Sequence, residues 1–480
     1  DPQQRLLLER GYAALHDGAL TRSSLGGSLS GVFLGFAGSE YAQLLAASPA
    51  GSGVYAATGA VSSIASGRLS YTLGLHGPCV SYDTACSSAL SACHGGVRAL
   101  QLGECAVGLV AGVTLMFLPA SGTSFAVAGM TSARGRSHTF DARADGYARG
   151  EACGGVAVRR AVAAASCRLD GSAVRQDGRS ASLTAPNGQA QQGLLVAALA
   201  ESSTSAGELS LVEAHGTGTA LGDPIEAGAL TAAVLSARAE PLAVGGVKAN
   251  IGHAEPAAGM TGLLKLLLGL RRREAMANAQ LRVLNPHVGD RVGSVPCSLP
   301  SQQVASTVSG EGRGGVSSFG FSGTIAHAML KGAASSRATR VDAVIAPVAY
   351  RRRAFLWREP PHPFLHRRLP TADSGAALFR SPAANGALQA LVAGHVVQGR
   401  LVFPGAGYLE AARAALPVQS ALCGVFFLQP LAIETAGLLV ECAVAVDGRF
   451  EVRSIDADML ADAAVHCSGS CTAALGWLQA

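Results

Sequence analysis

The chain has few aromatic and charged residues and no long hydrophobic run. Phe, Trp and Tyr make up 5% of its 480 residues, and Asp, Glu, Lys and Arg make up 14%. The longest apolar stretch, GLLKLLLGL at 262–270, contains Lys265 and is too short to cross a bilayer, so it predicts a buried helix. A net charge of +5 is too weak and too dispersed to indicate nucleic-acid binding. We therefore expect neither a membrane nor a nucleic acid as partner.

Paired cysteines are absent as well. The eleven cysteines are scattered and form no C-x-x-C pair, which argues against a disulfide framework and favours a reducing compartment. We therefore expect a cytoplasmic protein. The first residues, DPQQRLLLERGYAAL, have the pattern of a helix, and no initiator Met or targeting segment stands before them. The sequence therefore predicts that an N-terminal part is missing.

The abundant residue types predict an α/β protein. Hydrophobic residues make up 49% of the chain and 60 residues are glycine, a composition typical of close helix-to-sheet packing. From 31 to 330, β-rich runs alternate with helical ones: PCVSYD is followed by CSSALSACHGGVRALQLG, and LSLVEAH is followed by DPIEAGALTAAVLSA. This alternation predicts a layered α/β domain with a largely buried sheet.

The composition changes after this domain. Residues 331–358 are rich in Ser and Arg and predict a linker. From 359 to 480, apolar runs that include GVFFLQPLAI, GLLVECAVAV and GRFEVRSI predict a second, smaller α+β domain, with a strand, a helix and then antiparallel strands. We therefore expect one domain over 1–330 and another over 359–480.

Cys86 has the local setting of a reactive thiol. The strand PCVSYD runs into the small residues TACSS, which open a helix, so the thiol lies in the first helical turn. The positive end of the helix dipole and the unpaired N–H groups there are expected to lower its pKa and favour the thiolate. A cysteine packed in the core remains the alternative, because cysteine is among the most often buried residues.

Two further cysteines lie seven residues to either side of Cys86. Cys93 is nearly two turns further along the same helix face, so we interpret it as core packing. Cys79 lies on the preceding strand, and a zinc site needs four convergent ligands where only His94 is near in sequence. We therefore expect no metal site.

Two loops that contain histidine follow predicted strands. EAHGTGTALGDPIEAGAL places His215 after LSLVE, and KANIGHAEPAAGM places Lys248 and His253 five residues apart across a loop. A cysteine with two histidines is able to perform covalent acyl transfer, because the thiolate attacks and the imidazoles donate hydrogen bonds to the developing oxyanions. A nearby lysine sets the orientation and protonation of the histidines. Taken alone, a histidine is more often structural than catalytic, and the prediction depends on the two histidines together at strand ends.

A fourth segment, GGVSSFGFSGTIAHAML, has the Gly and Ser content of a tight loop between strands. Backbone N–H groups in such a loop are suited to complete an oxyanion hole. We interpret His327 in this segment as structural.

Seven blocks of the sequence resemble, in order, motifs of the β-ketoacyl synthase domain of modular polyketide synthases. They are DPQQRLLLE, TACSSAL, FDARADGYARGEACG, GSAVRQDGRSASLTAPNG, EAHGTGTALGDPIEAGAL, KANIGHAEPAAGM and SSFGFSGTIAH. The resemblance implies a thiolase-like fold with αβαβα layers, a homodimer, and an acyltransferase that catalyses decarboxylative Claisen condensation in polyketide or fatty-acid-like biosynthesis.

The resemblance also implies roles for the residues of the site. Cys86 is the nucleophile that accepts the acyl chain, and its retention favours chain extension. His215 and His253 promote decarboxylation of a malonyl-type extender and stabilise the resulting enolate, and Lys248 organises the two histidines.

The same resemblance implies how substrates are held. Thr217 and Thr219 match positions that contact the phosphopantetheine arm of acyl carrier protein, which brings the substrate, so no cofactor is bound directly. The backbone N–H groups of Cys86 and Phe321 match the family's oxyanion hole.

One departure from the family pattern leaves an alternative function open. Where the family reads GTNAH this chain has GTIAH, so an amide that braces the active-site loop is replaced by Ile325. A non-elongating domain that binds acyl carrier protein and only passes the chain on is therefore the second hypothesis. A truncated fragment without a stable fold is the third.

The second domain resembles the N-terminal half of a polyketide synthase dehydratase, a double hot-dog fold. The resemblance is carried by HPFL and by GHVVQGRLVFPGAGYLEAA, with His395, Gly399 and Pro404 as its H-x-x-x-G-x-x-x-x-P motif. It implies that His395 is the base that removes the α-proton, kept neutral by its apolar neighbours. The partner aspartate belongs to a second hot-dog beyond this sequence, so the dehydratase is expected to be inactive.

An acyltransferase is the component that the family often inserts between these two domains. No G-x-S-x-G elbow lies there, while VAYRRRAFLW resembles the linker that follows an acyltransferase. Either the extender is loaded by an acyltransferase in trans, or a segment is missing from the sequence.

Overall fold

The computed structural model describes residues 1–38, 40–48, 51, 53, 55–160, 165, 167–305, 312–332, 348, 362–371, 376–383, 386–416, 420–433, 437–456 and 459–473. Contacts divide the chain into two units, Asp1–Ala349 and Tyr350–Ala480. The predicted linker 331–358 and its VAYRRRAFLW segment lie outside the described residues, apart from 331–332, which end a strand, and Val348.

The first unit contains two main sheets. The first has the order β2-β1-β3-β4, in which β4 is the antiparallel strand. Its strands are β1 (Ser30–Gly35), β2 (Cys79–Tyr82), β3 (Val107–Thr114) and β4 (Ala152–Arg159). The second has the order β5-β12-β11-β6-β7-β9. Its strands are β5 (Cys167–Gln176), β6 (Leu209–Glu213), β7 (Leu242–Gly245), β9 (Cys297–Ser298), β11 (Arg313–Phe319) and β12 (Thr324–Gly332).

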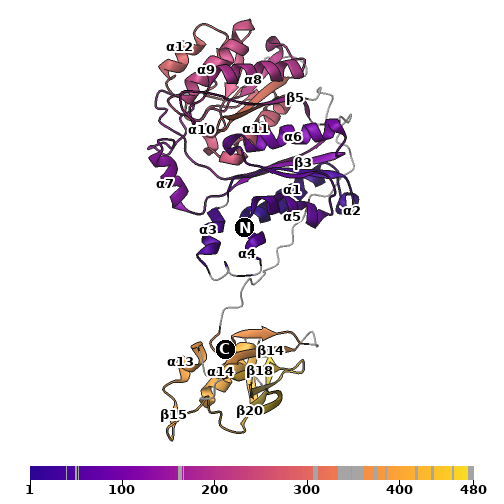
Figure 1. Ribbon diagram of the computed structural model, residues 1–480, viewed down its shortest axis with the longest axis vertical. Coiled ribbons are helices and arrows are strands. Elements are labelled where there is room, and N and C mark those ends of the chain that lie inside the picture. The colour runs from indigo at the N-terminus through magenta and orange to yellow at the C-terminus, as the bar shows by residue number, and fades with distance from the viewer. Residues whose placement is uncertain are drawn as a thin grey trace, which may run out of the picture. The chain divides into compact units, whose positions relative to one another are not determined.

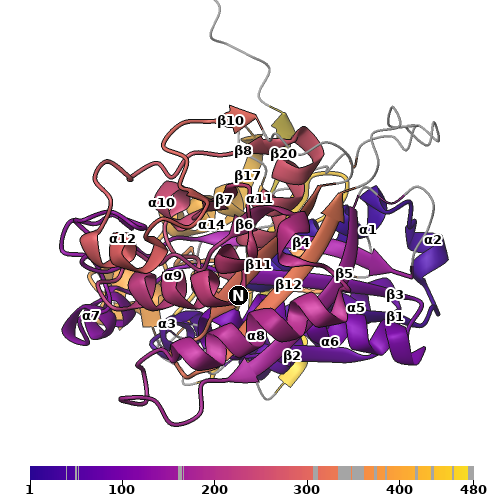
Figure 2. The same cartoon turned by 90° about the horizontal axis from the view of Figure 1, so that it is seen from above.

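Helices lie between the sheets and on both outer faces (Figure 1). The inner pair is α6 (Ser88–Leu102) and α11 (Ala258–Arg272), and the outer pairs are α1 (Pro2–Asp17) with α5 (Ser62–Leu73) and α8 (Gly188–Glu201) with α9 (Gly222–Ala233). Helix α8 lies along β5 and β12 (Figure 2). The five layers confirm the αβαβα architecture.

Shorter elements connect these layers. They are α2 (Arg22–Leu25), α3 (Glu40–Ala46), α4 (Ala56–Gly59), α7 (Pro119–Val127), α10 (Lys248–Ile251), α12 (Pro286–Val292), and the paired strands β8 (Glu274–Ala275) and β10 (Val304–Ala305).

Helix α11 contains the longest apolar run of the sequence. Its buried leucines, Leu263, Leu266 and Leu270, recur at helical spacing and join the core between the two sheets. Burial of each contributes about 2 kcal/mol. Lys265 projects from the same helix to Glu213, with Nζ 2.7 Å from Oε2. The prediction of a buried helix is confirmed. None of the described helices is long and apolar enough to cross a membrane.

Helix α6 packs unusually close to the first sheet. A Cβ on Gly35 of β1 would lie 2.5 Å from the backbone nitrogen of Ala89, so only glycine allows this approach. The close packing fixes the start of α6 against the carboxyl ends of β1 and β2, which is where the chain turns at Cys86.

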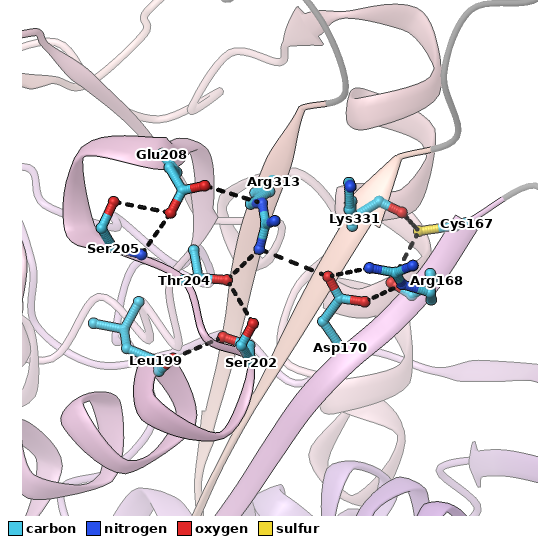
Figure 3. A network of polar contacts seen from close by, with 10 residues as sticks. All are labelled: Cys167, Arg168, Asp170, Leu199, Ser202, Thr204, Ser205, Glu208, Arg313 and Lys331. Atoms are coloured by element: carbon cyan, nitrogen blue, oxygen red, sulfur yellow. Dashed lines mark hydrogen bonds and ion pairs between the residues drawn. The ribbon is translucent and has the colours of Figure 1, made fainter. Parts of the chain in front are cut away.

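A polar network around Arg313 ties three strands and a turn together at the edge of the second sheet (Figure 3). Arg313 on β11 donates to Thr204 Oγ1 at 2.6 Å, and lies 3.7 Å from carboxylate oxygens of both Asp170 on β5 and Glu208. Cys167 Sγ contacts the carbonyl oxygen of Lys331 on β12 at 3.1 Å. The network fixes the ends of β5, β11 and β12.

The second unit is built on a six-stranded antiparallel sheet with the order β13-β14-β18-β19-β20-β17. The strands are β13 (Arg367–Leu369), β14 (Ala377–Pro382), β17 (Ser420–Phe427), β18 (Leu438–Val444), β19 (Arg449–Asp456) and β20 (Met459–Ala473). Helix α14 (Gly405–Ala415) packs on β17, β18 and β19 through Tyr408, Ala411 and Ala412, as in a hot-dog fold. The predicted antiparallel strands are confirmed.

The apolar run LQALV of this unit lies in helix α13 (Gly386–Val392). Short apolar runs fit a strand and a buried helix equally well, and here Leu388 and Val392, four residues apart, both enter the core. The strand pair that follows, β15 (Val396–Val397) with β16 (Arg400–Leu401), is a separate hairpin.

Candidate active site

Cys86 lies at the corner where β2 ends and α6 begins. It is the middle residue of a 3₁₀ turn, η2 (Ala85–Ser87), and its side chain is almost fully buried. Ala85 before it has φ +52°, a left-handed conformation that a residue other than glycine rarely adopts. The Ser318 hydroxyl on β11 donates to the carbonyl oxygen of Cys86 at 2.7 Å. The structure therefore holds the predicted strand-to-helix corner in one conformation.

The predicted thiolate at Cys86 is wrong for the resting site. Burial raises the pKa of the Cys86 thiol to about 11, and this outweighs the lowering by the Lys248 charge and by the Phe321 backbone N–H. The start of α6 is surrounded by a low-dielectric core, and this burial outweighs the effect of the helix dipole on the thiol. The resting thiol is neutral, and any thiolate depends on hydrogen-bond donors near the sulfur.

His253 supplies one such donor. Its Nε2 lies 3.1 Å from the Sγ of Cys86. Its Nδ1 accepts a hydrogen bond from the backbone N–H of Glu255 at 3.0 Å, so the neutral ring carries its proton on Nε2. Burial lowers the pKa of His253 well below its ordinary value, and the Lys248 charge lowers it further. His253 is therefore a neutral Nε2–H donor that faces the sulfur.

His215 has the same tautomer. Its Nδ1 accepts from the backbone N–H of Phe319 at 3.3 Å, which leaves the proton on Nε2. Burial, with the charge of Lys248, lowers its pKa well below the ordinary value. The His215 ring lies edge to face with that of His253, with 5.6 Å between centroids. The two imidazoles are therefore neighbouring neutral donors, and one of them, His253, lies beside the thiol.

Lys248 is buried and its Nζ donates to the carbonyl oxygen of His215. It is the first residue of the short helix α10, so the predicted loop between Lys248 and His253 contains a helical turn. Burial lowers the pKa of Lys248, while Glu213 and Glu226 act to raise it. The lysine thus fixes the backbone of one histidine and acts electrostatically on both.

Three further residues, Phe321, Thr217 and Thr219, were predicted to belong to the site. The backbone N–H of Phe321 contacts the Cys86 sulfur, whereas its ring is exposed. The hydroxyl oxygens of Thr217 and Thr219 lie 3.1 Å apart on the loop that carries His215. The roles implied for these three residues stay predictions.

Ile325 and His327 lie on β12 behind the site. Ile325 is fully buried, pairs with Phe319 across the strands and packs against Leu194. Apolar packing therefore braces the loop where the family has an amide. The Nδ1 of His327 lies 2.9 Å from the hydroxyl of Ser317, and its burial lowers its pKa to about 4, which agrees with the structural interpretation.

Cys79 and Cys93, seven residues to either side of Cys86, lie where the sequence predicted. Cys93 is buried in the core between the sheets and Cys79 is exposed on β2, and all eleven cysteines are free. Within the part of the chain that the structure describes, no group of three or more His, Cys, Asp or Glu side chains is arranged to hold a metal ion.

Sequence reasoning missed the carboxylates that shape the His215 loop. Glu226 accepts the backbone N–H groups of His215 at 2.7 Å and Gly216 at 2.8 Å, and Asp223 accepts that of Gly218 at 3.0 Å. Burial raises the pKa of Glu226 to about 7 and that of Asp223 to about 6. The signal was two acids within one helical turn of an otherwise apolar segment, DPIEAGAL.

His395 in the second unit does not have the environment that was predicted. Its side chain is exposed, and its valine neighbours Val396 and Val397 are 57% and 47% exposed, so they form no apolar wall. The Nδ1 of His395 lies 2.7 Å from the carbonyl oxygen of Val402. The β15–β16 hairpin stands outside the main sheet, which explains why these side chains are uncovered.

Comparison with known proteins identifies both units. Residues 1–164 and 166–282 match the N-terminal and C-terminal domains of β-ketoacyl synthase, and residues 362–455 match the polyketide synthase dehydratase domain. Over 339 residues the chain is 43% identical to the spectinabilin polyketide synthase system protein NorC of Streptomyces orinoci. The chain belongs to the modular polyketide synthases. Its first unit is a ketosynthase and its second is part of a dehydratase domain.

Further relatives of this polyketide synthase agree. Erythronolide synthase EryA2 of Saccharopolyspora erythraea is 40% identical over 351 residues, 71% of this chain and 10% of that protein. NorC is matched over 69% of this chain and 15% of its own length. The ketosynthase from module 6 of the bacillaene synthase of Bacillus subtilis 168 has a TM-score of 0.65 and 33% identity, covering 69% of this chain and 60% of that one. This polyketide synthase chain thus spans a small part of the curated relatives.

Proposed function

We propose that the first unit catalyses decarboxylative Claisen condensation between an acyl chain on Cys86 and a malonyl-type extender. The observation that carries the proposal is a pair of neighbouring neutral Nε2–H donors, His215 and His253, the second of which lies beside the buried thiol. A single general base would explain hydrolysis, whereas two fixed donors suit a reaction in which negative charge develops on a thioester oxygen.

The first half of the proposed reaction is acyl transfer. The Cys86 sulfur attacks the incoming thioester, and the thiol of the donor is released. The Nε2–H of His253 and the positive charge of Lys248 stabilise negative charge on the sulfur. The N–H groups of Cys86 and Phe321 are the proposed donors to the carbonyl oxygen of the acyl-enzyme.

The second half forms the carbon–carbon bond. The extender carboxylate leaves as carbon dioxide, and its bonding electrons become an enolate whose oxygen accepts from His215 and His253. The enolate carbon attacks the acyl carbonyl, and the bond to sulfur breaks to release Cys86 as a thiolate, which takes up a proton from solvent to return to the neutral thiol. Because burial keeps both imidazoles neutral, neither offers a full positive charge, and the stabilisation comes from fixed dipoles.

The substrates of this site are proposed to arrive on acyl carrier protein. Thr217 and Thr219 would contact the phosphopantetheine arm, which carries both acyl groups. The proposal is supported by the position of both hydroxyls on the loop that carries His215. An acyltransferase acting in trans is the proposed source of the extender.

The ketosynthase unit is also proposed to act as a homodimer. Strand β2 is an edge strand of the first sheet, and Cys79 and Val80 on it are exposed. An edge strand with exposed apolar residues is a surface suited to pairing with a second copy of the chain.

The proposed condensation is tested with an acyl carrier and a malonyl carrier supplied together. Wild-type protein is expected to form a β-ketoacyl carrier, and His253→Ala to lose condensation far more than acyl loading, which is itself slowed. A folded wild-type protein that loads Cys86 and forms no product would replace this proposal with the non-elongating transfer function.

A further inference from the structure

His253 is held from both sides by a neighbouring segment of the chain, residues 147–150. The backbone N–H of His253 donates to the carbonyl oxygen of Ala148 at 2.6 Å, and that of Gly150 donates to the carbonyl oxygen of His253 at 2.9 Å. The ring of Tyr147 meets the His253 ring edge to face, with 4.8 Å between centroids. The position of the imidazole is therefore fixed by this segment.

The tautomer of His253 is fixed by a different contact, the backbone N–H of Glu255. Glu255 has φ +42°, a left-handed conformation that is strained for a residue other than glycine. Such a conformation persists only where the surroundings hold it. The holding contact is a fork from Arg149, with Nε 2.6 Å from Oε1 and Nη2 3.2 Å from Oε2 of Glu255.

Arg149 is itself held by a second acid and an aromatic ring. Its Nη2 lies 3.1 Å from Oε1 of Glu40, at the start of α3, and its guanidinium lies 5.4 Å from the ring centre of Phe125 on α7. Glu40 in turn accepts the backbone N–H groups of Phe117 and Leu118, at 2.6 and 2.7 Å. With its side chain 12% exposed, Arg149 is a buried bridge between two acids.

We propose that Arg149 is a positioning residue, which acts through Glu255 to hold His253 as the Nε2–H donor to Cys86. Without the fork, the strained Glu255 backbone relaxes and its N–H leaves Nδ1 of the imidazole. The proton then favours Nδ1, and Nε2 accepts from the thiol where it had donated to it. This inference rests on the proposed function of the same site, because it names the residue that orients the histidine donor used there.

Several charged or titratable groups face Cys86 and also affect how the reactivity of its thiol depends on pH. They are Lys248 on α10, His253 and Glu255 on the following loop, and Tyr147 on the neighbouring segment. A change in the reactivity of the Cys86 thiol is therefore attributed to Arg149 only when the compared variants keep all four of these groups.

The test is the rate at which iodoacetamide alkylates Cys86 in the full chain, followed by mass spectrometry from neutral to alkaline pH, with Cys86→Ala as the blank. The variants are Arg149→Gln, which removes charge and fork, and Arg149→Lys, which keeps the charge but cannot form the fork. The matched control is Arg98→Gln, which breaks an ion pair with Glu201 of 2.6 Å on the surface of α6.

We expect Arg149→Gln to slow alkylation at neutral pH by about tenfold, because loss of the donor raises the thiol pKa by about one unit. Arg149→Lys is expected to be slowed by about threefold, as one charged contact is a partial substitute. Arg98→Gln should match the wild type. Unchanged profiles for both Arg149 variants would overturn the proposal, as would an equal slowing by Arg98→Gln.

A second measurement starts from protein whose Cys86 is already acylated. Mixed with malonyl carrier, Arg149→Gln is expected to condense about tenfold more slowly than the wild type, since the donor to the enolate is misplaced. The alkylation profile needs no carrier. If the wild type makes no product, the proposed function fails, and the alkylation result alone still decides the role of Arg149.

Discussion

Burial decides the protonation state of each residue in the active site. The thiol of Cys86 and the imidazoles of His215 and His253 are all kept neutral by the same apolar surroundings. Chemistry at this site therefore depends on where hydrogen bonds point, more than on formal charge. Lys248 is the exception, as its Nζ is held between the carbonyl oxygen of His215 and nearby acids.

The clearest prediction at this scale compares two buried cysteines, Cys86 in the turn η2 and Cys93 on the following helix α6. Cys86→Ala should abolish acyl loading, because it removes the nucleophile, while Cys93→Ala should load at close to the wild-type rate. Cys93 lies in the core, where burial alone raises its pKa to about 12. Intact-mass measurement after incubation with an acyl thioester checks this. If only Cys93→Ala lost acyl loading, the assignment of Cys86 as the nucleophile would be wrong.

The raised pKa of Cys86 predicts a distinctive pH dependence. Its thiolate fraction grows as pH rises toward about 11, so alkylation of Cys86 should accelerate through the alkaline range without levelling near pH 8.5, the ordinary cysteine value. The lowered histidine pKa values predict that preloaded protein keeps condensing as pH falls below about 6.5, since the neutral donors persist there. Rate profiles of the two steps, measured separately, check both halves. A plateau in alkylation at neutral pH would contradict the first.

Sequence was informative about residue identity and less so about environment. Cys86, His215, Lys248 and His253 were selected because each follows a predicted strand, although β2 belongs to the first sheet and β6 and β7 to the second. The thiolate prediction failed because burial comes from residues distant in sequence. The predicted apolar environment of His395 is wrong for the opposite reason, because valines that are adjacent in sequence need not cover its side chain in the folded chain.

The elements that position the site follow from local pattern. Strand β6 and helix α9, and strand β7 and helix α11, were all predicted from a change in hydrophobic period at the strand end. The short α10 and α13 were not, because four to seven residues hold too few turns for a period to show. The carboxylates of α9 were overlooked because their partners are backbone N–H groups, which no side-chain pattern reveals.

The turn between β11 and β12 offers a test at this scale. A Cβ on Gly320 would lie 2.3 Å from the carbonyl oxygen of Thr84, so Gly320→Ala must displace the backbone beside Cys86. We expect a loss of about 1–3 kcal/mol in stability and slower acyl loading. In Gly207→Ala the new Cβ meets nothing within 4 Å, so stability should change by no more than about 0.5 kcal/mol. Thermal unfolding of both variants decides, and equal melting temperatures would contradict the packing account.

Two units with separate cores make up the chain, and each matches its own part of a polyketide synthase. The sequence predicted both cores because composition and period change between them. Which surfaces meet other copies or carriers is a property of the assembly, and the sequence implies it only through family resemblance, so the homodimer and the carrier contacts remain proposals.

The edge strand β2 provides the prediction for the assembly. Val80→Lys should convert a dimer to a monomer, because a lysine on an exposed edge strand opposes strand pairing. Leu102→Lys at the end of α6 is the control, since Leu102 is exposed but lies on no strand edge. Sedimentation of the wild type and both variants gives the answer. A monomeric wild type, or a dimeric Val80→Lys protein, would rule out pairing through β2.

The central claim is that two histidine donors beside Cys86 couple loss of carbon dioxide to carbon–carbon bond formation. The most direct test is a single turnover in which acyl-loaded protein is mixed with malonyl carrier and both products are counted. The account predicts equal amounts of carbon dioxide and β-ketoacyl carrier from the wild type, and neither at an appreciable rate from a preloaded double variant His215→Ala, His253→Ala. Carbon dioxide without β-ketoacyl product, or product formed equally well by the double variant, would contradict it.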